Sequence, residues 1–162
     1  MLVRDAQPEE FAEIGDIRVC AYQADGFLSP GSTYAPTLRA LGTNGDGDIL
    51  VAVAEGKLAG TVMLQLGGPK SDLVSSADEA EIRALAVAPA ARGQGTGRAL
   101  LTAVIARAVQ RGVRHLVLCT QTEMHAAQQL YASAGFGRLA DRDWSPVPGV
   151  TLIAYGLRLP PG

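Results

Sequence analysis

The sequence has few cysteines and no long apolar run, and each shortage excludes a class of protein. Its only cysteines, Cys20 and Cys119, form no Cys-x-x-Cys pair, which excludes a disulfide framework and a zinc site of the usual spacing. No stretch approaches the roughly 18 uninterrupted apolar residues that a membrane span requires. The N-terminus carries Arg4 and Asp5 instead of the apolar core of a secretory signal. We therefore expect a cytoplasmic protein with no metal and no contact with a membrane.

Basic charge is not in excess either. Lys and Arg number 14 against 16 Asp and Glu, for a net charge of -2. A nucleic-acid-binding domain is usually strongly basic, so we expect no nucleic-acid partner, and any attraction for an anionic cofactor must be local. With 162 residues, 48% of them hydrophobic, the chain is long enough for a core and is expected to form a single domain spanning residues 1–162.

Hydrophobic periodicity and turn residues divide the chain into strands and helices in the order β-α-α-β-β-β-α-β-α-β-β. This order predicts an α/β fold with one mixed sheet and helices on its faces. Gly, Pro, Ser and Asp are frequent in the expected loops, which are 27–32, 67–79 and 141–149. The expected strands are 2–4, 48–54, 58–64, 80–87, 113–119, 137–140 and 150–157, and the expected helices are 8–25, 33–41, 95–110 and 123–134.

The most informative segment is the turn Arg92-Gly93-Gln94-Gly95-Thr96-Gly97, where a strand passes through Pro89 into a helix. A helix N-terminus exposes unpaired N–H groups and therefore binds phosphate well. Glycine lets the backbone approach an anion closely, and Arg92 and Arg98 can add charge-assisted contacts. The turn lacks the Lys-Ser/Thr pair of a P-loop and comes too late in the chain for a dinucleotide fingerprint. On local evidence, the glycines could also simply cap and pack a helix.

Two segments in sequence carry a resemblance to a known family. The run Glu81-Ile-Arg-Ala-Leu-Ala-Val-x-Pro-x-x-Arg-Gly-Gln-Gly-Thr-Gly97 resembles the acetyl-CoA signature of the GNAT superfamily of N-acetyltransferases. Leu116 to Cys119, followed by Ala-Ala-x-x-Leu-Tyr131-x-x-x-Gly-Phe136, resembles the family's next strand and helix. Together they cover about residues 80–140. The resemblance implies a GNAT-like single domain, with a mostly antiparallel mixed sheet, helices on both faces and splayed parallel central strands.

The resemblance also implies acetyl-CoA as the cofactor, bound where the central strands separate. Backbone groups of Leu85, Ala86 and Val87 would contact the pantetheine arm, and the turn at 92–97 with Arg98 would hold the pyrophosphate. The implied reaction is direct transfer of an acetyl group, in a ternary complex, to a primary amine of a small molecule or peptide. Dimers are common in the family, so a homodimer is compatible with it.

Direct transfer requires a base for the ammonium group and an acid for the leaving thiolate. Tyr131 stands where many family members carry the tyrosine that protonates the thiolate; otherwise it is a packed helical tyrosine. Glu81 stands in an Ala-Glu-Ile run like that of the histone-acetylating branch, whose glutamate is the base; otherwise it is a strand-end carboxylate paired with Arg83. Glu79, expected on the preceding loop, is the reserve base.

This sequence lacks two residues that are typical of one branch of the family. Enzymes that acetylate ribosomal-protein N-termini have a glutamate twelve residues before the tyrosine and an asparagine seven before it. Here these positions hold Cys119 and Met124, so that base is missing and the acceptor is left open.

The resemblance also implies that the acceptor binds near the loop between the first two helices, where this fold usually recognises it. The expected pocket residues there are Tyr22, Asp25, Phe27 and Tyr34. Trp144 either walls the pocket or anchors the loop 141–149. Two rival hypotheses remain at this point: a non-catalytic acyl-CoA-binding or regulatory GNAT-like domain, and a nucleotide- or phosphate-binding module of another class.

Overall fold

The structure, a computed structural model, describes residues 1–29, 31–66 and 78–161. Within these residues, eight strands form one sheet in the order β1-β2-β3-β4-β5-β8-β6, and β7 pairs with β8. Every described helix is too short or too polar to pass through a membrane. The strands are β1 (Leu2–Asp5), β2 (Gly47–Ala54), β3 (Lys57–Leu66), β4 (Glu79–Val87), β5 (His115–Gln121), β6 (Gly137–Arg138), β7 (Trp144–Val147) and β8 (Val150–Arg158). The helices are α1 (Phe11–Ala24), α2 (Ala35–Ala40), α3 (Thr96–Gln110) and α4 (His125–Ser133).

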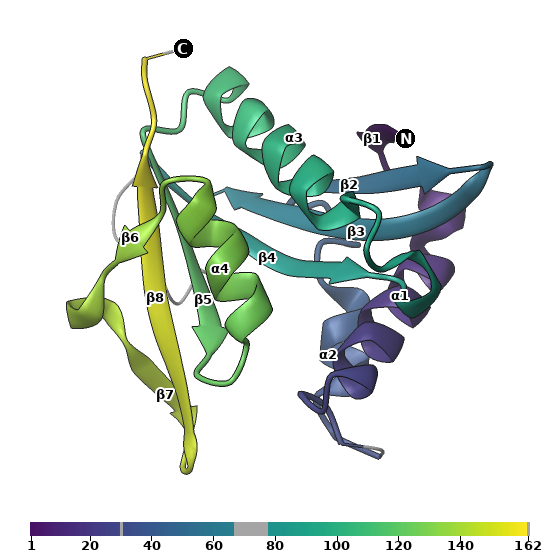
Figure 1. Cartoon of the computed structure of the whole chain (residues 1–162), viewed down its shortest axis with the longest axis horizontal. Helices are drawn as coiled ribbons and strands as arrows, with labels where there is room; N and C mark the ends of the chain where they lie inside the picture. Colours follow the sequence, from purple (N-terminus) through teal and green to yellow (C-terminus); the bar gives the residue numbers. More distant parts are fainter. Residues whose placement is uncertain (30, 67–77, 162) are drawn as a thin grey trace.

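The two central strands are the only parallel neighbours among the described strands, and they separate along their length. β4 and β5 pair only where residues 79–81 lie opposite residues 115–117. Beyond that point β4 continues to Val87 and β5 to Gln121, but the two strands no longer pair with each other and they diverge (Figure 1). All other strand pairs are antiparallel. The structure thus confirms a mostly antiparallel mixed sheet with splayed parallel central strands.

Helices cover both faces of this sheet. On one face, Leu100 and Val104 of α3 and Tyr131 of α4 pack with Ile82 and Leu118 of the central strands. On the other face, α1 and α2 pack against β2, β3 and β4 in smaller apolar clusters. Burial of apolar side chains on both faces, at about 25 cal/mol per Å² of apolar surface, is what fixes the three layers. We refer below to the α3/α4 face and the α1/α2 face.

A β-bulge in β4 lies at the point where the strands have separated. Met63 of β3 is paired with Arg83 and Thr61 with Ala86, so Ala84 and Leu85 both stand opposite one residue. Ala84 has a φ of 54°, a left-handed conformation that is costly for a residue with a Cβ. The bulge reverses the alternation of the strand: Ala84 packs on the α1/α2 face, and Leu85 packs against the α3/α4 core.

The expected elements are confirmed in order, with differences at several ends. The helix expected over 8–25 begins with a 3-10 turn, Pro8–Glu10, before α1, and the helix expected over 33–41 is only the six residues of α2. Glu79 is the first residue of β4 and does not lie in the preceding loop. The last strand but one, expected over 137–140, ends at Arg138. Residues 67–77 of the expected loop, and Pro30 of another, lie outside the described residues.

The prediction of a loop over 141–149 was wrong in part. It contains the end of a 3-10 turn (Ala140–Arg142) and the whole of β7, which forms a hairpin with β8. Pro146 lies within β7, where the edge of a sheet tolerates a residue without an N–H donor. Pro148 and Gly149 make the turn between β7 and β8, and Gly149 has the positive φ that such a turn favours.

Candidate active site

The glycine-rich turn before α3 has the backbone conformation that requires glycine. Gly93 has φ 79° and Gly95 has φ 78°. A Cβ added at either position would meet no atom within 4 Å, so the conformation itself, and not lack of space, disfavours other residues. Both glycines are exposed to solvent. The turn therefore presents an open stretch of backbone at the N-terminus of a fifteen-residue helix.

The N–H groups of this stretch are unused. None of the amide groups of residues 93–98 has an acceptor within the described parts of the chain, and the first helical bond begins at Ala99, which donates to the Gly95 carbonyl. The Thr96 hydroxyl is buried and also has no hydrogen-bond partner there. Donors clustered at the positive end of a helix dipole suit an anion. These residues fit a diphosphate group.

Arg92 already has a partner in the protein. Its two terminal nitrogens donate to Asp25 Oδ1 (2.9 Å) and Oδ2 (3.2 Å), and its Nε donates to the Val87 carbonyl (3.2 Å). Asp25 follows the last residue of α1, so this pair joins the end of α1 to the turn. The structure thus places Asp25 beside the turn predicted for the cofactor. Arg98, in the first turn of α3, is exposed.

Beside the turn, β4 separates from β5 and leaves part of its edge unpaired. Leu85, Ala86 and Val87 all lie beyond the last β4–β5 pair, which joins Glu81 and Val117. The β5-facing edge of these three residues has no strand partner among the described strands, because β5 has turned away. Backbone groups on an unpaired edge can accept or donate hydrogen bonds to an extended ligand.

Tyr131 reaches the core between the two strands from α4. The side chain is 6% exposed, and its ring meets that of Phe136 edge-on, with centroids 5.7 Å apart. Burial raises the pKa of the Tyr131 phenol, and the nearby phenol of Tyr22 raises it further. The hydroxyl makes no hydrogen bond with any residue that the structure describes. Tyr131 is therefore a protonated, unengaged donor.

Glu81 lies on the α1/α2 face of β4, at the last residue paired with β5. Its side chain is 12% exposed, and its Oε2 is 3.9 Å from Arg83 Nε. Cys119 of β5 lies nearby. Burial raises the pKa of the Cys119 thiol to about 11, the Glu81 charge adds to this, and the Trp144 indole N–H opposes it. At that pKa the thiol remains protonated, so Cys119 is not a nucleophile.

The Glu79 carboxylate forms a buried network of ion pairs and hydrogen bonds. Its carboxylate accepts two hydrogen bonds from Arg142, at 2.9 and 2.8 Å, and lies 2.7 Å from His115 Nδ1. The side chain is 5% exposed and lies at the closed, paired end of the two central strands. Arg142 is distant from Glu79 in sequence, so residue spacing could not predict that these two side chains would pair. A carboxylate held in this way is poorly placed to take a proton from an acceptor.

The residues expected around the acceptor do not all lie in one place. Tyr22 packs on the α1/α2 face, and burial raises its pKa to about 12, against the opposing charges of Arg18 and Arg83. Tyr34 is exposed, and its phenol also acts on both Tyr22 and Arg18. These four groups therefore lie within electrostatic reach of one another.

The remaining two expected acceptor residues lie towards β5. The Phe27 carbonyl accepts a hydrogen bond from Gln121 at the end of β5 (3.5 Å). Trp144 is half-buried on β7, beside the Cys119 thiol. Phe27 and Trp144 thus border the same face as Glu81, whereas Asp25 lies beside the cofactor turn.

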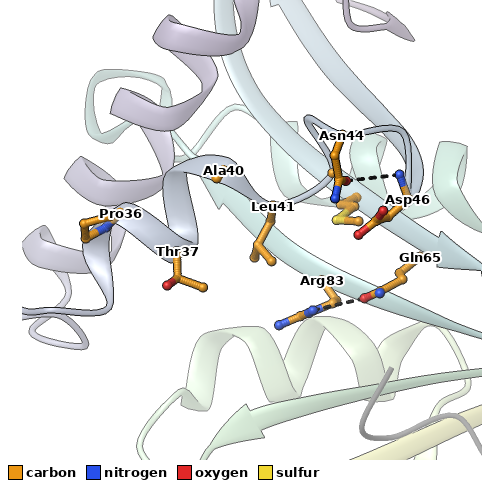
Figure 2. A pocket seen from close by; sticks show the side chains of 10 residues that line it. Pro36, Thr37, Ala40, Leu41, Asn44, Asp46, Gln65 and Arg83 are labelled. Carbon is orange, nitrogen blue, oxygen red and sulfur yellow. Dashed lines mark hydrogen bonds between the residues drawn. The ribbon is translucent and has the colours of Figure 1, made fainter. Parts of the chain in front are cut away.

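A pocket on the α1/α2 face was missed by sequence reasoning. It has a volume of about 480 Å³ and lies between α2, the segment before β2, and strands β3 and β4 (Figure 2). Arg83 lines it and donates to Gln65 Oε1 (3.0 Å). The sequence offered no spacing that joins these elements, because α2 is short and its partners are far away in the chain. The polar residues around the pocket include Thr37, Asn44, Asp46, Gln65 and Arg83.

Comparisons with known proteins bear on this arrangement. The sequence model of the acetyltransferase (GNAT) family matches residues 11–136, more than half of the chain. The chain belongs to this family. Its enzymes are acyltransferases that use acetyl-CoA.

Individual GNAT relatives are similar over parts of the sequence. The chain is 35% identical over 102 residues to a mycothiol acetyltransferase of Cellulomonas flavigena, covering 61% of this chain and 29% of that protein. It is 40% identical over 72 residues to the ribosomal protein bS18 alanine N-acetyltransferase of Haemophilus ducreyi, covering 44% of this chain and 50% of that one. The chain therefore spans half or less of the length of these curated relatives.

Solved GNAT structures match nearly the whole chain. The ribosomal-protein-S18-alanine N-acetyltransferase of Escherichia coli has a TM-score of 0.73 at 25% identity, covering 97% of this chain and 92% of that one. An acetyltransferase of Salmonella typhimurium, solved with acetyl-CoA, has a TM-score of 0.76 at 21% identity, covering 98% and 94%. At this level of identity the likeness supports the fold and leaves the acceptor undetermined.

Proposed function

We propose that this GNAT protein transfers the acetyl group of acetyl-CoA directly to a primary amine of a small molecule or peptide. The observation that carries the proposal is the row of unpartnered amide groups at residues 93–98, next to the strand edge where β4 leaves β5. In this proposal the turn with Arg92 and Arg98 holds the pyrophosphate, and the backbone at 85–87 holds the pantetheine arm.

Acetyl-CoA, when bound, supplies a thioester whose carbonyl carbon is open to attack by an amine. The overall change forms one C–N bond and breaks one C–S bond, so the ammonium group of the acceptor must lose a proton and the departing sulfur must gain one. This chain contributes one group for each of these proton tasks.

Tyr131 is the acid in this proposal. Its pKa is raised by burial, so the phenol keeps its proton at neutral pH and can donate a hydrogen bond, and then the proton, to the departing sulfur. The hydroxyl has no competing acceptor within the described residues, which leaves it available for this role. The ring is held in place by the core and by Phe136.

Glu81 is the base. It lies on the α1/α2 face, where the pocket and the tyrosines Tyr22 and Tyr34 are found, whereas Tyr131 approaches from the α3/α4 face. The base and the acid thus stand on opposite faces of the gap between β4 and β5. Glu81 can take the ammonium proton through a water molecule, which keeps the base apart from the departing sulfur.

The test is an amine-library assay that reads the release of free CoA and detects the acetylated product by mass. We expect product from at least one class of primary amine. A thermal-shift comparison should show stabilisation by acetyl-CoA and not by ATP or NAD. Binding of acetyl-CoA without product from any amine would favour a non-catalytic acyl-CoA-binding domain, and preference for ATP or NAD would contradict the cofactor site.

A further inference from the structure

The α1/α2 face contains a buried arginine that pairs with no carboxylate among the described residues. Arg18 of α1 is 0% exposed. Its Nη1 donates to the carbonyls of Leu38 (3.0 Å), Arg39 (3.3 Å) and Leu41 (2.8 Å), which ties α1 to the end of α2. Its Nε and Nη2 have no acceptor within the described residues. A buried guanidinium without a carboxylate is costly, and burial lowers the pKa of Arg18 to about 10.

A second arginine faces the pocket in front of this buried charge. Arg83 points from β4 towards α2, near Thr37 and Leu41 (Figure 2). Its Nη1 donates to Gln65 Oε1, and its side chain is 29% exposed. Leu41 belongs to the pocket wall, and its carbonyl is held by Arg18, so Arg18 stands behind that wall. Arg83 is one of the charges that lower the pKa of Arg18, so the two guanidinium groups repel each other across the wall.

Acidic groups lie near Arg83 as well. Glu81 forms an ion pair with Arg83, with Oε2 3.9 Å from Nε, which is longer than a hydrogen bond, and Asp46 also lines the pocket (Figure 2). The pocket thus holds fixed charges of both signs, with the positive groups grouped at β4 and α1. An acceptor that carries an anion together with its amine would complement this distribution.

We propose that Arg83 binds a carboxylate of the acceptor, so that the acceptor is a small amine of the amino-acid type. The inference rests on the proposed acetyl transfer and narrows its substrate class. Arg83 has the planar fork that matches a carboxylate, and Arg18 adds positive potential from behind. Glu81, two residues earlier on the same face of β4, is positioned for the amine of the same molecule. A volume of about 480 Å³ suits a small molecule.

The sharpest test compares each free L-amino acid in a panel with its carboxamide, which differs only in the anion. For the preferred side chain, the acid should be acetylated with a lower KM than the amide. Arg83→Gln should raise the KM for the acid about 10- to 100-fold, the usual range for lost hydrogen bonds to a charged group, and should leave the KM for the amide nearly unchanged. Arg83→Lys should give an intermediate loss, because lysine keeps the charge but not the fork.

Binding is also measured without turnover, by calorimetry of the acid and the amide in the presence of CoA. The loss of affinity in Arg83→Gln should follow the loss seen in KM. Arg158→Gln, at an exposed arginine of β8, is the matched control and should change neither. Thermal melting and CoA affinity of each variant show that it is folded.

The outcomes separate this inference from the proposed function. If acids and amides are acetylated equally, or if Arg83→Gln weakens both alike, the carboxylate site is wrong and the acetyltransferase proposal stands. If no amine is acetylated but amino-acid binding still depends on Arg83, the subsite stands and the transferase proposal fails. If Arg83→Gln does not fold, the comparison of acid with amide in the wild-type protein and in Arg83→Lys decides the matter.

Discussion

The two faces of the sheet are built in different ways. On the α3/α4 face, the proposed cofactor site comes from one continuous stretch, from the end of β4 through the turn into α3, and its donors are backbone amides. On the α1/α2 face, the pocket is assembled from α2, the segment before β2, and strands β3 and β4, and its chemistry is carried by side chains. The first kind of site depends on local conformation and the second on long-range packing.

The difference shows where a family is recognised and where its members diverge. A turn of bare N–H groups can bind a diphosphate whatever the side chains around it, so it serves many enzymes with one cofactor. A pocket of side chains can change its acceptor by a few substitutions without affecting the turn. The following variants test whether the two halves can be altered separately.

Gly95→Glu should produce the largest effect, confined to the cofactor half. A carboxylate about 4 Å from a phosphate costs roughly 4 kcal/mol per pair of charges at an effective dielectric of 20, which is about 1,000-fold in affinity. The substitution also forces a residue with a Cβ into φ 78°. We expect CoA binding to be lost in calorimetry while the protein remains folded.

A matched glycine isolates the effect of backbone strain. Gly112 follows α3 and has φ 79°, and a Cβ there also meets nothing within 4 Å. Gly112→Glu should reduce stability to the same extent as Gly95→Glu and leave CoA affinity intact. Equal CoA affinity in the two variants would show that the turn does not bind the pyrophosphate.

Tyr131→Phe should reduce turnover by about 10²- to 10⁴-fold, the range for a lost general acid. The hydroxyl has no hydrogen bond to lose within the described residues, so CoA affinity and melting temperature should change little. Tyr155→Phe, which retains the ring stacked under Arg138, is the control and should keep full activity. A Tyr131→Phe enzyme as fast as wild type would mean that the acid lies elsewhere.

Glu81→Gln should have a smaller, pH-dependent effect on the acceptor half. Below the pKa of the acceptor amine most of the amine is protonated, so loss of the base should slow the reaction most at low pH and least at high pH. The measurement is kcat/KM across pH 6 to about 10, at saturating acetyl-CoA. An unchanged pH profile would indicate that water or another group, and not Glu81, is the base.

Glu79 provides the comparison for that experiment. Glu79→Gln leaves the buried His115 and the partly exposed Arg142 without their carboxylate, and breaking a buried pair is destabilising by about 3–5 kcal/mol. We expect a large loss of stability in denaturant unfolding. The pH–rate profile of the enzyme that remains folded should keep its shape, because Glu79 is held by Arg142 and His115 and does not act as the base.

The conformation of the glycine-rich turn and the bounds of α3 could largely be predicted from the sequence, for a physical reason, whereas their role in cofactor binding stays a prediction. The need for positive φ at Gly93 and Gly95 is local, so the residue type reports the conformation directly. The helix after the turn has an apolar face of period 3.6, which fixes its bounds closely. For Tyr131, helical spacing in its own helix supported only the alternative of a packed tyrosine, and the side chain is indeed in the core; its role as the acid stays a prediction.

The acceptor half could not be predicted in the same way. Asp25 was expected in the acceptor pocket but is paired with Arg92, because the end of α1 packs beside the turn. Arg83 was considered only as the partner of Glu81, and nothing in its neighbours along the chain pointed to Arg18 or to α2. Contacts between residues far apart in sequence depend on how the helices pack, which periodicity does not specify.

The pair Asp25–Arg92 is where the two halves meet, and it gives the smallest predicted effect. Arg92 must leave Asp25, or share it, to approach a pyrophosphate, so Asp25→Asn should release the guanidinium and remove one negative charge near the turn. An exposed ion pair of this kind is worth about 0.2–1 kcal/mol, so CoA should bind up to roughly fivefold more tightly, and stability should fall by no more than that energy. Calorimetry at low and at high salt measures this, and the gain should shrink at high salt because the charges are screened. Weaker CoA binding in Asp25→Asn would show instead that the pair holds Arg92 in the orientation that the cofactor needs, and the two halves would then be coupled through α1.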